Sequence, residues 1–82
     1  PTTSISREQL VEGLLLTTVM ADAGLTRSRG QARRMIQQGG AYVNDERVTD
    51  IDYTLTEQDL TPEGIMLRAG KKRFHRLVLS QE

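Results

Sequence analysis

The chain has 82 residues, of which 37% are hydrophobic and 27% are charged, and it contains no cysteine. A chain of this size forms one small domain, and this balance is typical of a globular protein rather than a disordered one. The lack of cysteine excludes disulfides, a thiolate nucleophile and a zinc site built on cysteine. The longest apolar runs have three residues, so we expect no membrane-spanning segment and no secretory signal. These features favour an intracellular protein, in the cytoplasm or in an organelle matrix.

Acidic and basic residues balance to a formal net charge of zero, but they are separated along the chain. Residues 27–43 carry four arginines and no acid, and residues 64–82 carry five basic residues and one acid. Between these two basic blocks, residues 44–63 carry seven acids and one arginine. A fold that brings the basic blocks together would be dipolar, so nucleic-acid binding stays open despite the zero net charge.

Apolar residues at helical spacing predict helices in the first half of the chain. Ser6 and Gln9 have the spacing of a capping box, which predicts a short helical turn over residues 7–11. The apolar pattern then predicts a helix over residues 14–23. Gly24 is expected to end this helix, because glycine tolerates the positive φ of a C-terminal cap.

The next helix carries the first candidate site. Ser28 and Gln31 predict its start through a second capping box, and the glycine pair at 39–40 predicts its end. With its apolar residues against the core, its arginines face outward, where guanidinium forks suit RNA phosphates and Gly30 lets a sugar-phosphate backbone come close. An ordinary solvated helix face is the alternative. We expect RNA contacts from Arg27, Ser28, Arg29, Arg33, Arg34 and Gln37.

After the glycine pair the apolar pattern changes to a period of two, which predicts strands. Asn44-Asp45 is expected to form a two-residue hairpin turn, and the acidic stretch 50–63 is expected to be irregular, with one helical turn over 56–59. The sequence therefore predicts a single domain over residues 1–82 of the α+β class: two adjacent helices packed on a small antiparallel sheet of about four strands. We expect residues 1–5 to be disordered and residues 80–82 to be frayed. The expected strands are residues 41–43, 47–49, 65–68 and 74–79.

The turn between the last two strands holds the second candidate site. Alternation along the last strand is taken to place Phe74 in the core, which leaves too few aromatic residues for a surface on which unpaired bases stack. Structured RNA, recognised by its shape and its phosphates, is therefore the expected partner. We expect RNA contacts here from Lys71, Lys72, Arg73 and His75.

Catalytic and metal chemistry find no support in the sequence. His75 is the only histidine, and no cysteine stands near it as a second metal ligand. The acids of the segment 44–63 lack the spacing of a calcium loop, and no phosphate-binding glycine motif follows a strand. We expect no catalytic residue, no metal and no cofactor in this domain.

Three segments carry a resemblance to a known family. The run SRGQARRMIQQGGAYVND over residues 28–45 resembles the RNA-binding domain of the ribosomal-protein-S-four type, which is also found in pseudouridine synthases. Together with DIDYTL over residues 50–55 and GKKRFH over residues 70–75, it is similar to the C-terminal domain of bacterial-type tyrosyl-tRNA synthetases. The combination of three segments is more specific than the helix motif alone.

The resemblance implies a domain that binds tRNA(Tyr) at its variable arm and anticodon stem and supports tyrosylation by a separate catalytic domain. The HIGH and KMSKS signatures of the synthetase are absent, so this fragment is not itself an enzyme. ATP would bind to the catalytic domain of a parent tyrosine–tRNA ligase. Two alternatives remain open: the same kind of domain in a pseudouridine synthase or a ribosome-associated protein, and a protein-docking module that uses the acidic segment 44–63.

Overall fold

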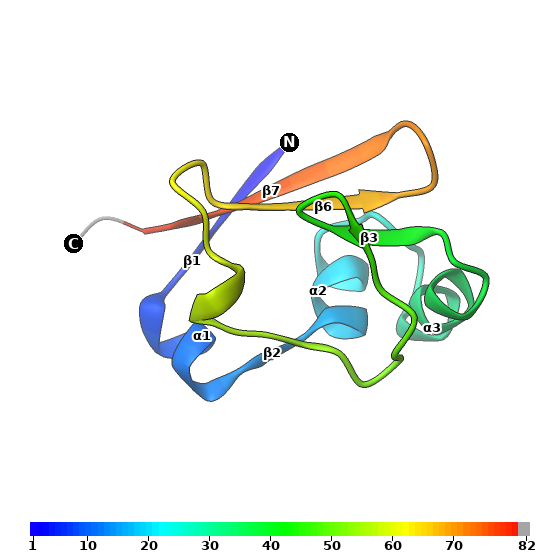
Figure 1. Ribbon diagram of the computed structural model, residues 1–82, viewed down its shortest axis with the longest axis horizontal. Helices are drawn as coiled ribbons and strands as arrows, with labels where there is room; N and C mark the ends of the chain where they lie inside the picture. The colour runs from blue at the N-terminus through cyan, green and yellow to red at the C-terminus, as the bar shows by residue number, and fades with distance from the viewer. Residues whose placement is uncertain (81–82) are drawn as a thin grey trace.

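Three helices and a five-stranded sheet form the fold of residues 1–80, the part of the chain that the computed structural model describes (Figure 1). The predicted α+β class and the two adjacent helices are confirmed. The helices are α1 (Arg7–Glu12), α2 (Leu16–Asp22) and α3 (Arg29–Gln37), with a 3-10 turn η1 (Glu57–Asp59). The large sheet contains β1 (Thr2–Ile5), β3 (Ala41–Val43), β4 (Glu46–Arg47), β6 (Ile65–Ala69) and β7 (Arg73–Leu79). A second sheet pairs β2 (Leu14–Leu15) with β5 (Thr54–Leu55).

Local hydrogen bonds set the helix boundaries. The Ser6 hydroxyl accepts a hydrogen bond from Gln9 N at 3.1 Å, and the Gln9 side chain accepts one from Ser6 N at 2.8 Å, so the predicted capping box of α1 is confirmed. The next helix begins later than predicted, because Leu14 and Leu15 pair with β5 in the small sheet instead. Leu16 N donates to the Tyr53 carbonyl at 2.9 Å at this junction, so strand pairing there overrides the helical spacing.

The large sheet is ordered β1-β7-β6-β3-β4, and β1 lies parallel to β7. It is therefore a mixed sheet of five strands, where the sequence predicts an antiparallel sheet of about four. Residues 1–5, for which the sequence predicts disorder, instead include β1, because this short segment pairs with the last strand of the chain. Ser80 N still donates to the Ile5 carbonyl at 2.8 Å, and residues 81–82, for which fraying is predicted, lie outside the described residues.

The predicted two-residue turn joins β3 to β4. Asn44 and Asp45 have φ values of 51° and 70°, the left-handed conformation that a type I′ hairpin needs at both positions. The Asn44 side chain accepts a hydrogen bond from Met66 N at 2.9 Å and donates one to the Asp59 carbonyl at 2.6 Å. These bonds tie the turn to β6 and η1. Strand β4 begins one residue and ends two residues earlier than predicted, and η1 lies within the predicted helical turn over residues 56–59.

The helices cover one face of the large sheet, and the core lies between them and this face (Figure 1). Side chains alternate along β6, so Ile65, Leu67 and Ala69 are buried in the core. The opposite face of the sheet, called the outer face here, has no helix over it. Its central side chains are Tyr42, Met66, Arg68, Phe74 and Arg76, all half-buried or exposed.

Candidate nucleic-acid interface

The first turn of α3 is capped by Ser28, as predicted. Ser28 has an extended backbone, and its hydroxyl accepts a hydrogen bond from Gln31 N at 3.1 Å. The second bond of the predicted capping box is not formed. The Gln31 side chain accepts a hydrogen bond from Arg27 N at 2.6 Å instead of one from Ser28 N. These bonds fix the backbone from which Arg27 and Arg29 project into solvent.

The outward face of α3 is basic and open. Ala32 and Ile36 are buried, which confirms the predicted inward face. At Gly30, a Cβ atom would meet nothing nearer than the Ser28 hydroxyl at 3.8 Å, with guanidinium nitrogens of Arg33 and Arg34 next in distance. Packing within the domain therefore does not require glycine at this position, which lies among the outward arginines. The exposed members of the predicted site are Arg27, Ser28, Arg29, Arg33, Arg34 and Gln37.

The turn between β6 and β7 lies at the same end of the molecule as α3, with β3 between them (Figure 1). Gly70 N donates to the Gly40 carbonyl at 2.7 Å, which joins the turn to the segment that follows α3. Arg73 Nη2 donates to the Gly24 carbonyl at 3.4 Å, which joins the start of β7 to the segment that precedes α3. The two basic blocks of the sequence, on α3 and on the β6–β7 turn, therefore meet at one end of the molecule, which is called the basic end here. Both lysines of the turn are exposed there.

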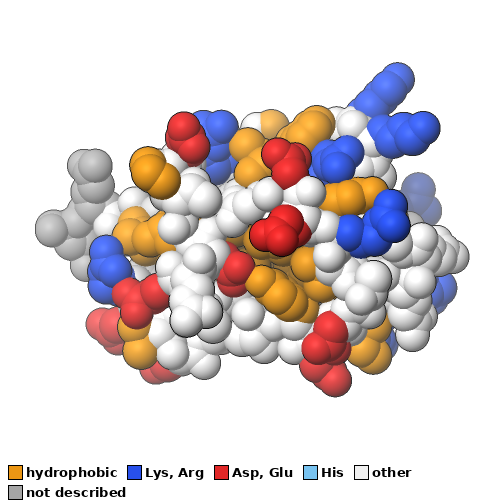
Figure 2. Space-filling view, viewed as in Figure 1, with side chains coloured by type: hydrophobic (Ala, Val, Ile, Leu, Met, Phe, Trp, Pro, Cys, Tyr) orange, Lys and Arg blue, Asp and Glu red, His pale blue; other side chains and the backbone are white. Residues whose placement is uncertain are grey.

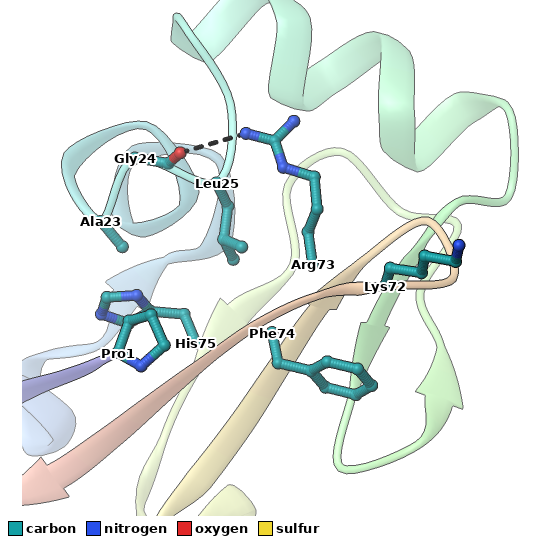
Figure 3. A pocket seen from close by; sticks show the side chains of 8 residues that line it. All are labelled: Pro1, Ala23, Gly24, Leu25, Lys72, Arg73, Phe74 and His75. Carbon is teal, nitrogen blue, oxygen red and sulfur yellow. Dashed lines mark hydrogen bonds between the residues drawn. The ribbon is translucent and has the colours of Figure 1, made fainter.

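A groove of about 430 Å³ separates the end of α2 from β7 (Figure 3). Figure 3 shows Arg73 reaching across it toward Gly24, while Phe74 points to the other side of the strand. Lys72 and Arg73 are the cations that line this groove. The groove thus offers a hollow with positive charge between the two basic blocks.

The structure corrects the assignment of Phe74 and His75. The sequence places Phe74 in the core and His75 among the RNA contacts, but Phe74 is 46% exposed and His75 only 7%. The predicted alternation is right; the inward side is the one that also carries Leu77, which pairs with Ile65 in the core. His75 Nε2 lies 2.6 Å from Thr3 Oγ1, and burial lowers the pKa of His75 below its ordinary value. His75 is therefore part of the β1–β7 contact, not of the exposed basic surface.

Two arginines that the sequence analysis missed extend the basic surface onto the outer face. The guanidinium of Arg68 lies 3.9 Å from the centroid of the Tyr42 ring, and that of Arg47 lies 5.7 Å from it. Arg47 also donates a hydrogen bond to the Tyr42 hydroxyl at 3.2 Å. The sequence analysis did not select Arg47, because it is the one basic residue among the seven acids of the segment 44–63. It did not select Arg68, because the aromatic neighbours of this residue depend on strand register. Alternation along residues 65–69 is the one sequence signal that could have placed Arg68 away from the core.

Charge is distributed unevenly over the molecule (Figure 2). Lys and Arg side chains gather at the right-hand end of Figure 2, over α3 and the β6–β7 turn, whereas acidic side chains lie over the middle and the left. Within residues 1–80 the only salt bridge joins Arg7 to Glu57, where α1 and η1 meet at the opposite end. The cations of α3 and of the turn therefore remain available to an external anion.

Two structural features are absent from residues 1–80. This part of the chain has no cluster of three or more His, Cys, Asp and Glu side chains placed to hold a metal ion. None of its helices is long and apolar enough to cross a membrane. The basic end instead presents charged hydrogen-bond donors on a fixed backbone, an arrangement that suits the oxygens of phosphate groups.

Comparison with known proteins identifies the family. The family model described as the tyrosine–tRNA ligase SYY-like C-terminal domain matches residues 1–77. Similar curated proteins include the tyrosine–tRNA ligase of Desulfatibacillum aliphaticivorans, 46% identical over 82 residues, covering 100% of this chain and 19% of the relative. That of Clostridium botulinum (strain Loch Maree / Type A3) is 47% identical over 79 residues, covering 96% of this chain and 19% of the relative. The chain spans about one fifth of the length of these relatives, and it belongs to the family of tyrosine–tRNA ligase C-terminal domains.

Proposed function

We propose that the chain is the RNA-binding appendage of a cytoplasmic tyrosine–tRNA ligase and that it holds tRNA(Tyr) for a separate catalytic domain. The observation that carries this proposal is the meeting of the two basic blocks at one end of the molecule. The Gly70–Gly40 and Arg73–Gly24 hydrogen bonds fix the β6–β7 turn against both ends of the α3 segment. One RNA backbone can then contact both blocks at once.

The proposed contacts are electrostatic. Arg29, Arg33 and Arg34 donate from α3 to phosphate oxygens, and the two lysines of the turn add charge at the neighbouring position. We assign these contacts to the variable arm and the anticodon stem of the tRNA, on the resemblance of the three sequence segments. ATP and tyrosine bind in the catalytic domain of the parent ligase, outside this chain.

The test replaces Arg33 and Arg34 together with alanine. Both side chains are exposed and point away from the core, so the double variant should weaken binding to tRNA(Tyr) at least tenfold, since each lost charged hydrogen bond is worth about 1.5–3 kcal/mol. The melting temperature should stay nearly unchanged. Fluorescence titration with labelled tRNA(Tyr) measures the affinity, and circular dichroism measures the melting.

The matched control is Arg7→Ala, which removes an exposed arginine from the opposite end of the molecule. This control should leave the affinity for tRNA(Tyr) unchanged. Unchanged affinity in the Arg33/Arg34 double variant, or a loss of folding, would contradict the assignment. Equal affinity for all structured RNAs would instead favour a general RNA-binding domain, as in a ribosome-associated protein, and salt-insensitive binding to a protein would favour a docking module.

A further inference from the structure

The outer face of the sheet carries a row of aromatic and arginine side chains across four adjacent strands. Strand register places Arg47 opposite Tyr42, Tyr42 opposite Arg68, and Arg68 opposite Phe74. Residues opposite one another on neighbouring strands lie side by side on the same face. We call these four residues the outer row. They come from two hairpins that are distant in sequence, β3–β4 and β6–β7, so only the fold brings all four together.

Arginine and aromatic side chains in the outer row stack on each other. The Arg68 guanidinium lies 3.9 Å from the centroid of the Tyr42 ring and 6.0 Å from that of Phe74. Arg68 Nε is buried without a hydrogen-bond partner among the described residues, so ring stacking, rather than hydrogen bonding at Nε, holds this side chain. The hydrogen bond from Arg47, with the nearby positive charges of Arg68 and Lys71, lowers the pKa of the Tyr42 hydroxyl. The outer row is thus both aromatic and electropositive.

Phe74 offers an open ring at one end of the outer row. It is 46% exposed, one of the few large apolar side chains of the chain left so open to solvent. A hollow of about 240 Å³ adjoins it, and Met66 and Arg76 line this hollow beside Phe74. Two arginines therefore flank the ring: Arg68 across the strand pair and Arg76 two residues along β7.

Charge marks the limits of this surface. On one side, the Arg47 side chain lies close to Gly39, where a Cβ atom would be 3.5 Å from it. Gly39 follows the end of α3, so the outer row is continuous with the basic end of the molecule. On the other side, Arg76 borders a second hollow that Asp45 and Glu63 also line. An anionic ligand would therefore approach the outer row from the α3 side and be repelled beyond Arg76.

We propose that the outer row binds one unpaired nucleotide of the RNA, with its base stacked on the ring of Phe74 and its phosphate attracted by Arg68 and Arg76. This inference rests on the proposed function, because it assumes that the basic end already holds an RNA. Open aromatic rings beside arginines suit a splayed base and its phosphate, since every base has a face that can stack. Arginine and aromatic side chains are also enriched in protein interfaces, so the choice of RNA over a protein rests on the continuity of the outer row with the basic end of the molecule.

The test compares two synthetic hairpin RNAs that share the variable-arm stem of tRNA(Tyr), one fully paired and one with a single unpaired 2-aminopurine in the stem. Phe74→Leu keeps an apolar side chain but removes the ring, and Phe74→Tyr keeps the ring. Phe74→Leu should weaken binding of the bulged RNA about tenfold, remove the quenching of 2-aminopurine fluorescence, and leave the paired RNA unaffected. Phe74→Tyr should behave as the unmodified chain. Val11→Ala, at an exposed apolar residue of α1, is the control for nonspecific surface effects.

The outcomes separate the two proposals. If the unmodified chain binds neither RNA, the proposed function fails. If it binds both RNAs and Phe74→Leu changes neither binding nor fluorescence, the stacking site alone is wrong and a protein partner is left as the occupant of this face. Equal weakening of both RNAs by Phe74→Leu would also overturn the site, because stacking on an unpaired base cannot affect a fully paired stem.

Discussion

The two ends of the molecule use their charged side chains in opposite ways. At the end formed by α1 and η1, charged groups bond to partners within the domain. Asp59 accepts hydrogen bonds from the Tyr53 hydroxyl at 2.7 Å and from Thr56 N at 3.1 Å. Glu57 pairs with Arg7 at 2.8 Å. At the end formed by α3 and the β6–β7 turn, the exposed arginines of α3 and the two lysines have no salt-bridge partner among the described residues.

This difference separates residues that serve the fold from residues that serve a ligand. Burial, together with the hydrogen bond to Asp59, raises the pKa of Tyr53 to about 12, so its neutral form is favoured within the domain. Such a group contributes to stability because its partner is internal. An exposed guanidinium without an internal partner contributes little to stability and remains free to bind phosphate. Substitutions at the two ends should therefore have different consequences.

Removing Lys71 and Lys72 should give the largest effect. If the basic end neutralises about four to six phosphates, log K should fall with log salt at a slope of roughly −4 to −5. Alanine at both positions should reduce this slope by about two for every RNA sequence and lower the affinity by one to two orders of magnitude at about 0.1 M salt. Titrations at several salt concentrations measure both quantities. An unchanged slope would mean that the turn does not touch RNA and that α3 binds alone.

Asp59→Ala, at the end formed by α1 and η1, should lower stability without changing RNA binding. It removes the acceptor for the Tyr53 hydroxyl and for Thr56 N, so the free energy of unfolding should fall by about 2 kcal/mol. The pKa of Tyr53 should fall from about 12 toward 10.0, which an ultraviolet absorbance titration of the variant would show. Affinity for tRNA(Tyr) should not change under conditions in which the variant is folded. A specific loss of RNA binding would break the division between the two ends.

Gly30→Ala should give the smallest and most diagnostic effect. A Cβ at this position meets no atom closer than 3.8 Å, so the variant should fold, and helix propensity should stabilise it by up to about 1 kcal/mol. RNA affinity should nevertheless fall, because the methyl group occupies the space into which the sugar-phosphate backbone would come. Melting curves and tRNA titrations measure the two changes. A stabilised variant with full affinity would mean that no backbone approaches α3 this closely.

Local signals predicted the elements whose ends are set by neighbouring residues. The capping serines of α1 and α3 lie where the sequence predicts them, because their hydrogen bonds join residues three positions apart. The Asn44-Asp45 turn also lies where it is predicted, because the two strands that it joins are adjacent in sequence. Strands β1, β2 and β5 were not predicted. Each has two to four residues, and each is ordered by pairing with a segment distant in sequence.

The candidate site likewise contains residues that local spacing predicts and residues whose positions depend on long-range packing. The outward arginines of α3 follow from helical spacing, and the structure places them on the exposed face as predicted. Phe74 and His75 could not be assigned to the correct faces, because alternation defines two faces without saying which one meets the core. The outer row as a whole could not be predicted, since its stacking depends on how the two hairpins pair with each other.

The parallel pairing of β1 with β7 has a consequence for the order of folding. Thr2 lies opposite Arg76, so this contact closes nearly the whole chain into a loop, whereas β6 and β7 are joined by a tight turn. Closing a long loop costs more conformational entropy than closing a short one. The β3–β4 and β6–β7 hairpins are therefore expected to form early, with β1 docking late on a prepared edge. The imidazole of His75 meets Thr3 only in that last step, which makes its buried state a marker for completed folding.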